Sequence, residues 1–110
     1  MSLTTFSGPV ASQNGFIVGS GATISKVLSG SASLNFGSIS AAAQADLTIT
    51  VTGAATGDEV ILALPASPTA GIVFNAFVSA ADTVTVRATN ITAAPVDPAA
   101  ATYGVIVLSA

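Results

Sequence analysis

Alternation of apolar and polar residues with a period of two is the feature that most constrains the fold of this chain. The segments Asp46–Thr52 and Thr83–Thr89 both alternate Leu, Ile, Val or Ala with Thr, Asp or Arg. Successive side chains of a strand point to opposite faces of a sheet, so this pattern predicts strands with one buried and one exposed face. Both segments are therefore expected to cover a common core.

Turn residues divide the rest of the chain into further short strands. Gly, Pro, Asn and Asp interrupt the apolar segments at intervals of about 8 to 12 residues, which is typical of a sandwich. The further strands that we expect are Phe16–Val18, Ala22–Val27, Ser31–Phe36, Val60–Leu64, Ile72–Val78 and Thr102–Leu108. About eight short strands predict an all-β fold, a single antiparallel β-sandwich or jelly-roll-like domain. Ala41–Gln44 is compatible with a helix but too short to nucleate one, so we expect a turn there.

Two of these strands carry apolar residues at nearly every position. Val60–Leu64 is continuously apolar, which is typical of a central strand that is buried on both faces. We expect Ile72–Val78 also to face protein on both sides. The predicted core consists of Leu34, Phe36, Leu47, Ile49, Val51, Ile61, Phe74, Val84, Val86, Val105 and Val107.

The first residues lack this alternation, and we divide the chain into an N-terminal arm at residues 1–14 and a β-sandwich domain at residues 15–110. The arm carries Leu3, Phe6 and Val10 among small polar residues, and Pro9 biases Gly8 towards an extended backbone. These apolar residues are too few to form a core of their own. We expect the arm to become ordered on another protein surface, with Phe6 as its anchor. The alternative is an arm that folds back as an edge strand of its own sandwich.

Charged residues are scarce, and this scarcity restricts the possible partners. The chain has two Lys or Arg, five Asp or Glu, and a net charge of −3. So few cations cannot supply the phosphate contacts of a nucleic-acid-binding protein or the attraction to anionic lipid. A surface of Ser, Thr, Ala and Gly is easily desolvated and suits a protein packed against other subunits.

A long uncharged stretch, Val60–Ala81, raises the question of a membrane span. Its length would allow one, but Pro65, Pro68 and Gly71 interrupt it, and its flanking charges are acidic. Two strands and a turn explain it better. We also expect no secretory signal peptide, because no basic region precedes an apolar run at the N-terminus.

The residue types that usually carry out catalysis are missing. The chain has no His and no Cys, and hence neither the usual general base nor a thiolate ligand. Ser25 and Lys26 are neighbours, which on a strand point to opposite faces, and Asp58 and Glu59 are expected at a turn. We therefore expect no enzyme, no cofactor and no metal site.

Two further residues are candidates for other roles. Asn90 begins an Asn-Ile-Thr glycosylation sequon, although an Asn also suits the end of a strand. Arg87 is the only arginine and lies on the polar face of its strand. We expect it to contact Asp82, Asp97 or a neighbouring subunit.

Two blocks of sequence resemble a known family. The opening FSGPVASQNGF at Phe6–Phe16, and the region from VTGA at Val51 through DTVTVRATN at Asp82–Asn90 to DPA and TY at Asp97–Tyr103, are similar to the small capsid decoration (cement) proteins of tailed bacteriophages. Together the blocks cover about two thirds of the chain. Neither block is a catalytic signature.

This resemblance implies a structural virion protein that binds the outer capsid surface and stabilises the shell by bridging capsomers. It implies the major capsid protein as partner, a homotrimer, synthesis in the host cytoplasm and a final location on the capsid exterior. The residues expected to contact the capsid or a neighbouring subunit are Leu3, Phe6, Pro9, Val10 and Arg87. The alternative is a tail-fibre or host-adhesion module that binds a surface glycan, although the chain lacks Trp, a common sugar-stacking residue.

Overall fold

The computed structural model describes residues 3–110, and within this range it is all-β, as predicted. Its eight strands are antiparallel to their partners, and no helix in the described range is long and apolar enough to cross a membrane. The strands are β1 (Phe16–Ile17), β2 (Thr23–Ile24), β3 (Lys26–Leu34), β4 (Gln44–Thr50), β5 (Glu59–Ala63), β6 (Ile72–Ala80), β7 (Thr83–Asn90) and β8 (Ala101–Ser109).

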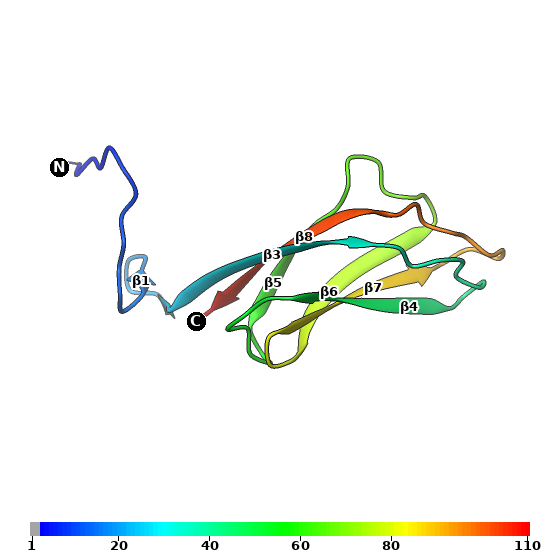
Figure 1. Ribbon diagram of the computed structural model, residues 1–110. Coiled ribbons are helices and arrows are strands. Elements are labelled where there is room, and N and C mark those ends of the chain that lie inside the picture. The colour runs from blue at the N-terminus through cyan, green and yellow to red at the C-terminus, as the bar shows by residue number, and fades with distance from the viewer. Residues whose placement is uncertain (1–2) are drawn as a thin grey trace.

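Six of these strands form a sandwich of two three-stranded sheets (Figure 1). One sheet has the order β3-β8-β5 and the other the order β4-β7-β6. The remaining pair, β1 and β2, forms a small hairpin outside the sandwich. Only the β6–β7 connection is a hairpin within one sheet of the sandwich, and the other connections cross between the sheets.

The predicted alternation sets the register of the central strand β7. Val84 and Val86 lie opposite Ile49 and Leu47 of β4 and face the interior, where both valines are fully buried. The intervening Thr85 and Arg87 lie on the outer face of the sheet. The alternation in sequence therefore appears directly as an inner and an outer face.

The core contains most of the residues predicted for it. Leu34, Ile49, Val51, Val84, Val86, Val105 and Val107 are buried, and Phe36, Leu47 and Phe74 are partly buried and pack against them. Tyr103, which was not predicted, is also buried, and its ring contacts the rings of Phe36 and Phe74 at centroid distances of 5.8 and 5.5 Å. Such tilted aromatic pairs stabilise a core beyond the area that they bury.

The prediction for the two apolar strands was wrong. Ile61 is 57% exposed, because β5 is an edge strand whose outer face has no covering layer. Strand β6 is an edge strand as well, and its Val73 and Phe77 point outwards. A strand is buried on both faces only where other layers cover both sides of its sheet. Each sheet of this two-layer sandwich is covered on one side, so the apolar residues on its other side are exposed.

A second, smaller core lies at the end of the sandwich away from the N-terminal segment and is organised by Asn90. The Asn90 amide nitrogen donates hydrogen bonds to the carbonyl oxygens of Ile39 and Ala94 at 2.9 and 2.8 Å. Its carbonyl oxygen accepts from the Thr92 backbone N–H and hydroxyl. Because Asn90 is completely buried, its side chain holds two loops together and cannot accept a glycan in the folded protein.

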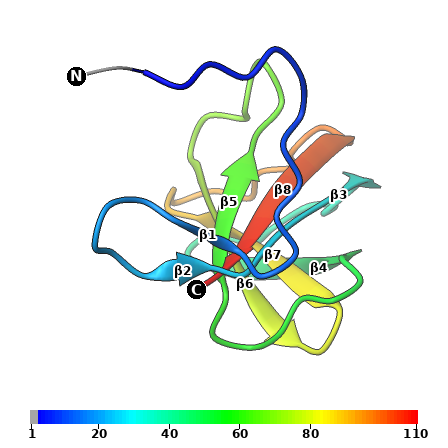
Figure 2. The ribbon, with the colours of Figure 1, turned by 90° about the vertical axis from the view of Figure 1, so that its left-hand side faces the viewer.

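The molecule is elongated because its N-terminal segment leaves the sandwich. Its extents are 58 × 29 × 24 Å and its radius of gyration is 17.4 Å, against about 13 Å for a compact domain of this length. Figures 1 and 2 show the segment before β3, including the β1–β2 hairpin, projecting from the end of the sandwich where the C-terminus lies. The hairpin thus stands between the expected arm and the first sandwich strand.

Candidate interaction surface

The expected arm residues lie on an exposed segment. Leu3 is 88% exposed, Phe6 68% and Val10 61%, and Pro9 is exposed as well. Residues 3–14 contain no strand. Met1 and Ser2, the first residues of the expected arm, lie outside the described residues.

The hairpin carries exposed apolar residues in addition to those that the sequence predicted for the interaction surface. Phe16, Ile17 and Val18 are 60%, 54% and 72% exposed. The alternation in this segment is too short to show which side is covered. A two-stranded hairpin is at best marginally stable in water, so its exposed apolar residues are a surface that contact with protein would stabilise.

A glycine permits the close contact on which this hairpin is built. Gly15 has a φ of +92°, and a Cβ atom at this position would lie 2.6 Å from the Ile24 carbonyl oxygen. The Ser12 hydroxyl donates a hydrogen bond to the Gly15 carbonyl at 2.5 Å. The sequence signal for this turn is the pair Asn14-Gly15, whose glycine adopts the left-handed backbone.

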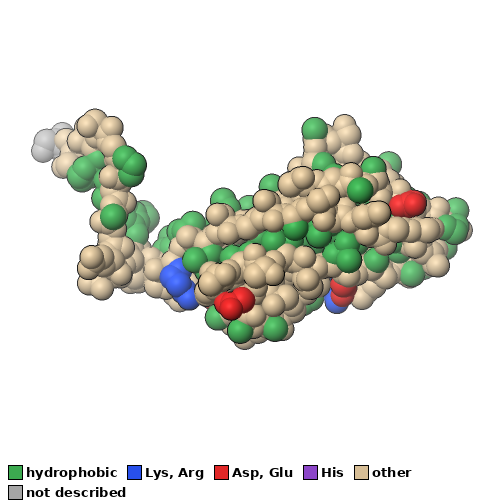
Figure 3. All heavy atoms as spheres, in the orientation of Figure 1, with side chains coloured by type: hydrophobic (Ala, Val, Ile, Leu, Met, Phe, Trp, Pro, Cys, Tyr) green, Lys and Arg blue, Asp and Glu red, His purple; other side chains and the backbone are tan. Residues whose placement is uncertain are grey.

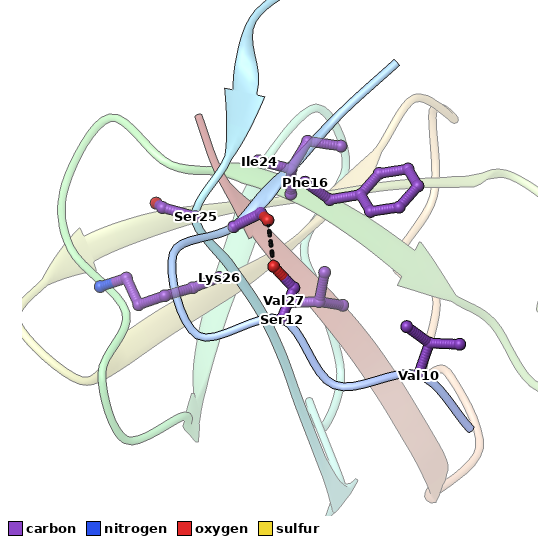
Figure 4. Close-up of a pocket in the computed structure, with 8 residues that line it drawn as sticks. Val10, Ser12, Phe16, Ile24, Ser25, Lys26 and Val27 are labelled. Carbon is purple, nitrogen blue, oxygen red and sulfur yellow. Dashed lines mark hydrogen bonds between the residues drawn. The ribbon is translucent and has the colours of Figure 1, made fainter.

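The arm, the hairpin and the start of β3 enclose a pocket of about 310 Å³. Its apolar lining comes from Val10, Phe16, Ile24 and Val27. In Figure 4, the side chains of Val10, Phe16 and Val27 lie to one side, while the side chain of Lys26 extends to the opposite side. The Lys26 ammonium donates a hydrogen bond to the Gly53 carbonyl oxygen at 3.0 Å, so this charge is held against the sandwich.

The apolar surface continues from the pocket onto the outer face of the β3-β8-β5 sheet. Val27 lies opposite Leu108, and Ile106 lies opposite Ile61. Val27, Ile61 and Ile106 are 64%, 57% and 42% exposed. Glu59 is the only charged residue among the described positions that share this face. Figure 3 shows few charged side chains on this side of the molecule. It shows hydrophobic side chains on both the projecting segment and the sandwich.

Arg87 does not join this surface. Its guanidinium forms two hydrogen bonds to the Asp46 carboxylate, at 2.9 and 3.0 Å, on the outer face of the β4-β7-β6 sheet. The expected contact to Asp82 or Asp97 was wrong, because the register places Asp46 directly opposite Arg87. The hydrogen bond from Arg87 lowers the pKa of Asp46, and the guanidinium lies 5.1 Å from the centre of the Phe77 ring.

The remaining candidate polar residues bind the backbone. The Ser25 hydroxyl donates to the Ser109 carbonyl oxygen at 3.1 Å, and the Asp58 carboxylate accepts from the Ala55 N–H at 3.0 Å. Asp82 has a φ of +60° in the β6–β7 turn and accepts from the Gly53 N–H. Among residues 3–110, no three acidic side chains come together in an arrangement that could hold a metal ion.

Comparison of the chain with protein-family models, with curated proteins and with solved structures finds no significant match.

Proposed function

We propose that this chain is a structural virion protein that decorates the exterior of a phage capsid and stabilises the shell by bridging capsomers. The observation that carries the proposal is the projecting, uncharged segment at one end of the sandwich, with Leu3, Phe6 and Val10 exposed. A decoration protein needs a folded body, a complementary footprint and no chemistry. The sequence resemblance to capsid decoration proteins supports the same function.

The absence of charge on this segment favours its attachment to another protein surface. Residues 3–25 carry no charge, so their burial against the major capsid protein desolvates no ion. Each attachment is small, and durable binding requires several subunits to act together. In the homotrimer that the resemblance implies, avidity would raise the overall affinity far above that of one arm.

The exposed aromatic residues favour decoration over glycan binding. Phe36, Phe74 and Tyr103 pack against one another in the core, and Arg87 covers the Phe77 ring. A sugar-binding face would need an open aromatic ring next to hydrogen-bonding groups. The open rings of Phe6 and Phe16 lie on the projecting segment, outside the sandwich.

The test is binding to capsids assembled from the major capsid protein that the same genome encodes. The chain should co-sediment with these capsids and raise the temperature at which they open. Deleting Met1–Val10 should leave the sandwich folded and abolish attachment. If the truncated chain decorates capsids normally, or the full chain does not bind them, the proposal fails.

A matched pair of variants tests whether the apolar residues of the arm, and not exposed apolar residues in general, are needed for binding to capsids. Replacing Leu3, Phe6 and Val10 together with Ser should prevent co-sedimentation. Replacing Leu64, Val73 and Ile91 with Ser changes three residues that are 41%, 52% and 68% exposed on the sandwich itself. This control should still bind.

A further inference from the structure

The pocket between the arm, the hairpin and β3 is open to solvent, and its lining consists of four apolar residues together with Ser12, Gly15, Ser25 and Lys26. We propose that it receives the Phe6 ring of a second copy of this chain, whose arm then continues along the outer face of the β3-β8-β5 sheet. This inference rests on the proposed function and goes beyond it, because it adds a contact of the arm with a neighbouring copy to the contact with the capsid.

The size of the pocket fits an aromatic ring. Its volume is about 310 Å³, and an apolar cavity of about 150 Å³ suffices to bind benzene. The lining by Val10, Phe16, Ile24 and Val27 matches the chemistry of a phenyl group. Since Lys26 is bonded to Gly53, the incoming ring would displace no free charge.

The chain's own Phe6 does not occupy this pocket. Val10 lines it, but Phe6 does not, and Phe6 is 68% exposed. Pro9 fixes the backbone between these two residues, and the N-terminal segment continues away from the sandwich (Figures 1 and 2). A ring from another molecule can approach from the open side.

The charge and length of the arm suit the surface beside the pocket. The arm is uncharged, and so are Val27, Leu108, Ile106 and Ile61; Glu59, opposite Leu108, is the one charged residue among the described positions of this face. The five residues that precede Phe6 span about 17 Å when extended, which is about half of the roughly 30 Å of the nine-residue strand β3. An arm that leaves the pocket can therefore cover about half the length of this face.

A second copy carries both halves of the contact. Each chain has a projecting ring and an open pocket, so every exchanged arm leaves its own pocket free for another arm. Such contacts need no further partner, and they form a closed symmetric assembly where the rotation between neighbouring copies closes.

Cysteine cross-linking tests this exchange directly, because the chain contains no cysteine. Ser7→Cys marks the arm beside Phe6, and Ser29→Cys marks the outer face beside Val27. Each substitution is placed in a different chain, so a disulfide between the two variants is intermolecular. The control partner is Thr48→Cys, an exposed position on the outer face of the other sheet.

We expect Ser7→Cys to cross-link to Ser29→Cys much faster than to Thr48→Cys, with light scattering showing an oligomer. Adding Phe6→Ala to the Ser7→Cys chain should weaken association by at least about tenfold, since it removes a large buried apolar side chain. Ile91→Ala alters a residue that is also 68% exposed, and it should have no effect.

Equal cross-linking to both positions, indifference to Phe6→Ala, or a monomer at all concentrations would overturn the inference. Cross-linking of Ser29→Cys to the capsid protein in place of the arm would assign the pocket to the shell and overturn it too. Copies that fail to exchange arms but still decorate capsids would leave the proposed function intact. Copies that exchange arms but do not bind capsids would contradict the proposed function alone.

Discussion

At the scale of single residues, Asn90 has the largest expected effect on stability. Asn90→Ala removes the hydrogen bonds from the side-chain amide to the carbonyl oxygens of Ile39 and Ala94 and those that its oxygen accepts from Thr92, and each lost hydrogen bond costs about 0.5–1.5 kcal/mol. We expect the free energy of unfolding to fall by about 3 kcal/mol, measured by chemical denaturation. Asn75→Ala, at an exposed position of β6, should change it by less than about 0.5 kcal/mol. Equal effects of the two substitutions would contradict this role of Asn90.

The ionisation of the buried Tyr103 side chain is expected to make the stability of the fold depend on pH. Burial raises the pKa of Tyr103 above its ordinary value of 10.0, so the unfolded chain loses this proton at lower pH than the folded protein. Its contribution to stability is present below the unfolded pKa and is lost as pH rises through the folded pKa. We expect the denaturation midpoint to fall at alkaline pH, and Tyr103→Phe to reduce this fall. Identical pH profiles for the two proteins would contradict the prediction.

Asp46 is expected to affect the stability of the fold at acidic pH. The hydrogen bond from Arg87 lowers its pKa, so its contribution is present above the unfolded pKa and is lost as pH falls through the folded one. Both side chains are exposed to solvent, and the pair therefore affects stability weakly. Because the chain has no His, no histidine ionisation adds a transition near neutral pH.

At the scale of the elements, the close approach of β3 to β4 depends on Gly30. A Cβ atom at Gly30 would lie 2.8 Å from Val51 Cγ2 and 3.1 Å from the Thr50 carbonyl oxygen. Gly30→Ala should therefore force β3 away from β4 and destabilise the sandwich by about 1–3 kcal/mol. Gly104→Ala is the matched control on β8, where the nearest atom would be 3.7 Å away. Differential scanning calorimetry should show a lower melting temperature only for Gly30→Ala.

The two faces of β4 should respond differently to a charge. Ile49→Asp places an unpaired carboxylate in the core, which costs several kcal/mol and so approaches the whole stability of a domain. Val86→Asp should unfold the protein in the same way. Thr48→Asp, on the outer face, should retain the circular dichroism spectrum of a folded β protein. Unfolding by Thr48→Asp or tolerance of Ile49→Asp would contradict the assigned faces.

At the scale of the whole molecule, the projecting segment adds length without adding to the core. Its hairpin residues Phe16 and Ile17 are exposed, and from residue 3 onwards Leu34 is the first residue that is fully buried in either core. Deleting Met1–Val10 should therefore leave the denaturation midpoint nearly unchanged. Small-angle scattering of a monomeric sample should show a radius of gyration below the 17.4 Å of the full chain. A large loss of stability would show that the arm folds onto its own sandwich.

The sequence by itself determined the all-β class, most of the strand segments and most of the core. The predicted strands Ala22–Val27 and Ser31–Phe36 are the exception, because β2 ends at Ile24 and one continuous strand, β3, runs from Lys26 to Leu34. Alternation in Asp46–Thr52 and Thr83–Thr89 is local information, because the geometry of a strand converts it into two faces. The exposure of Ile61, the pairing of Arg87 with Asp46 and the pocket beside Val27 were decided only by the tertiary structure. Each depends on which strands become edges, which residues stand opposite one another, and where the N-terminal segment leaves the sandwich. Those properties arise from contacts between segments far apart in the chain, and no local pattern encodes them.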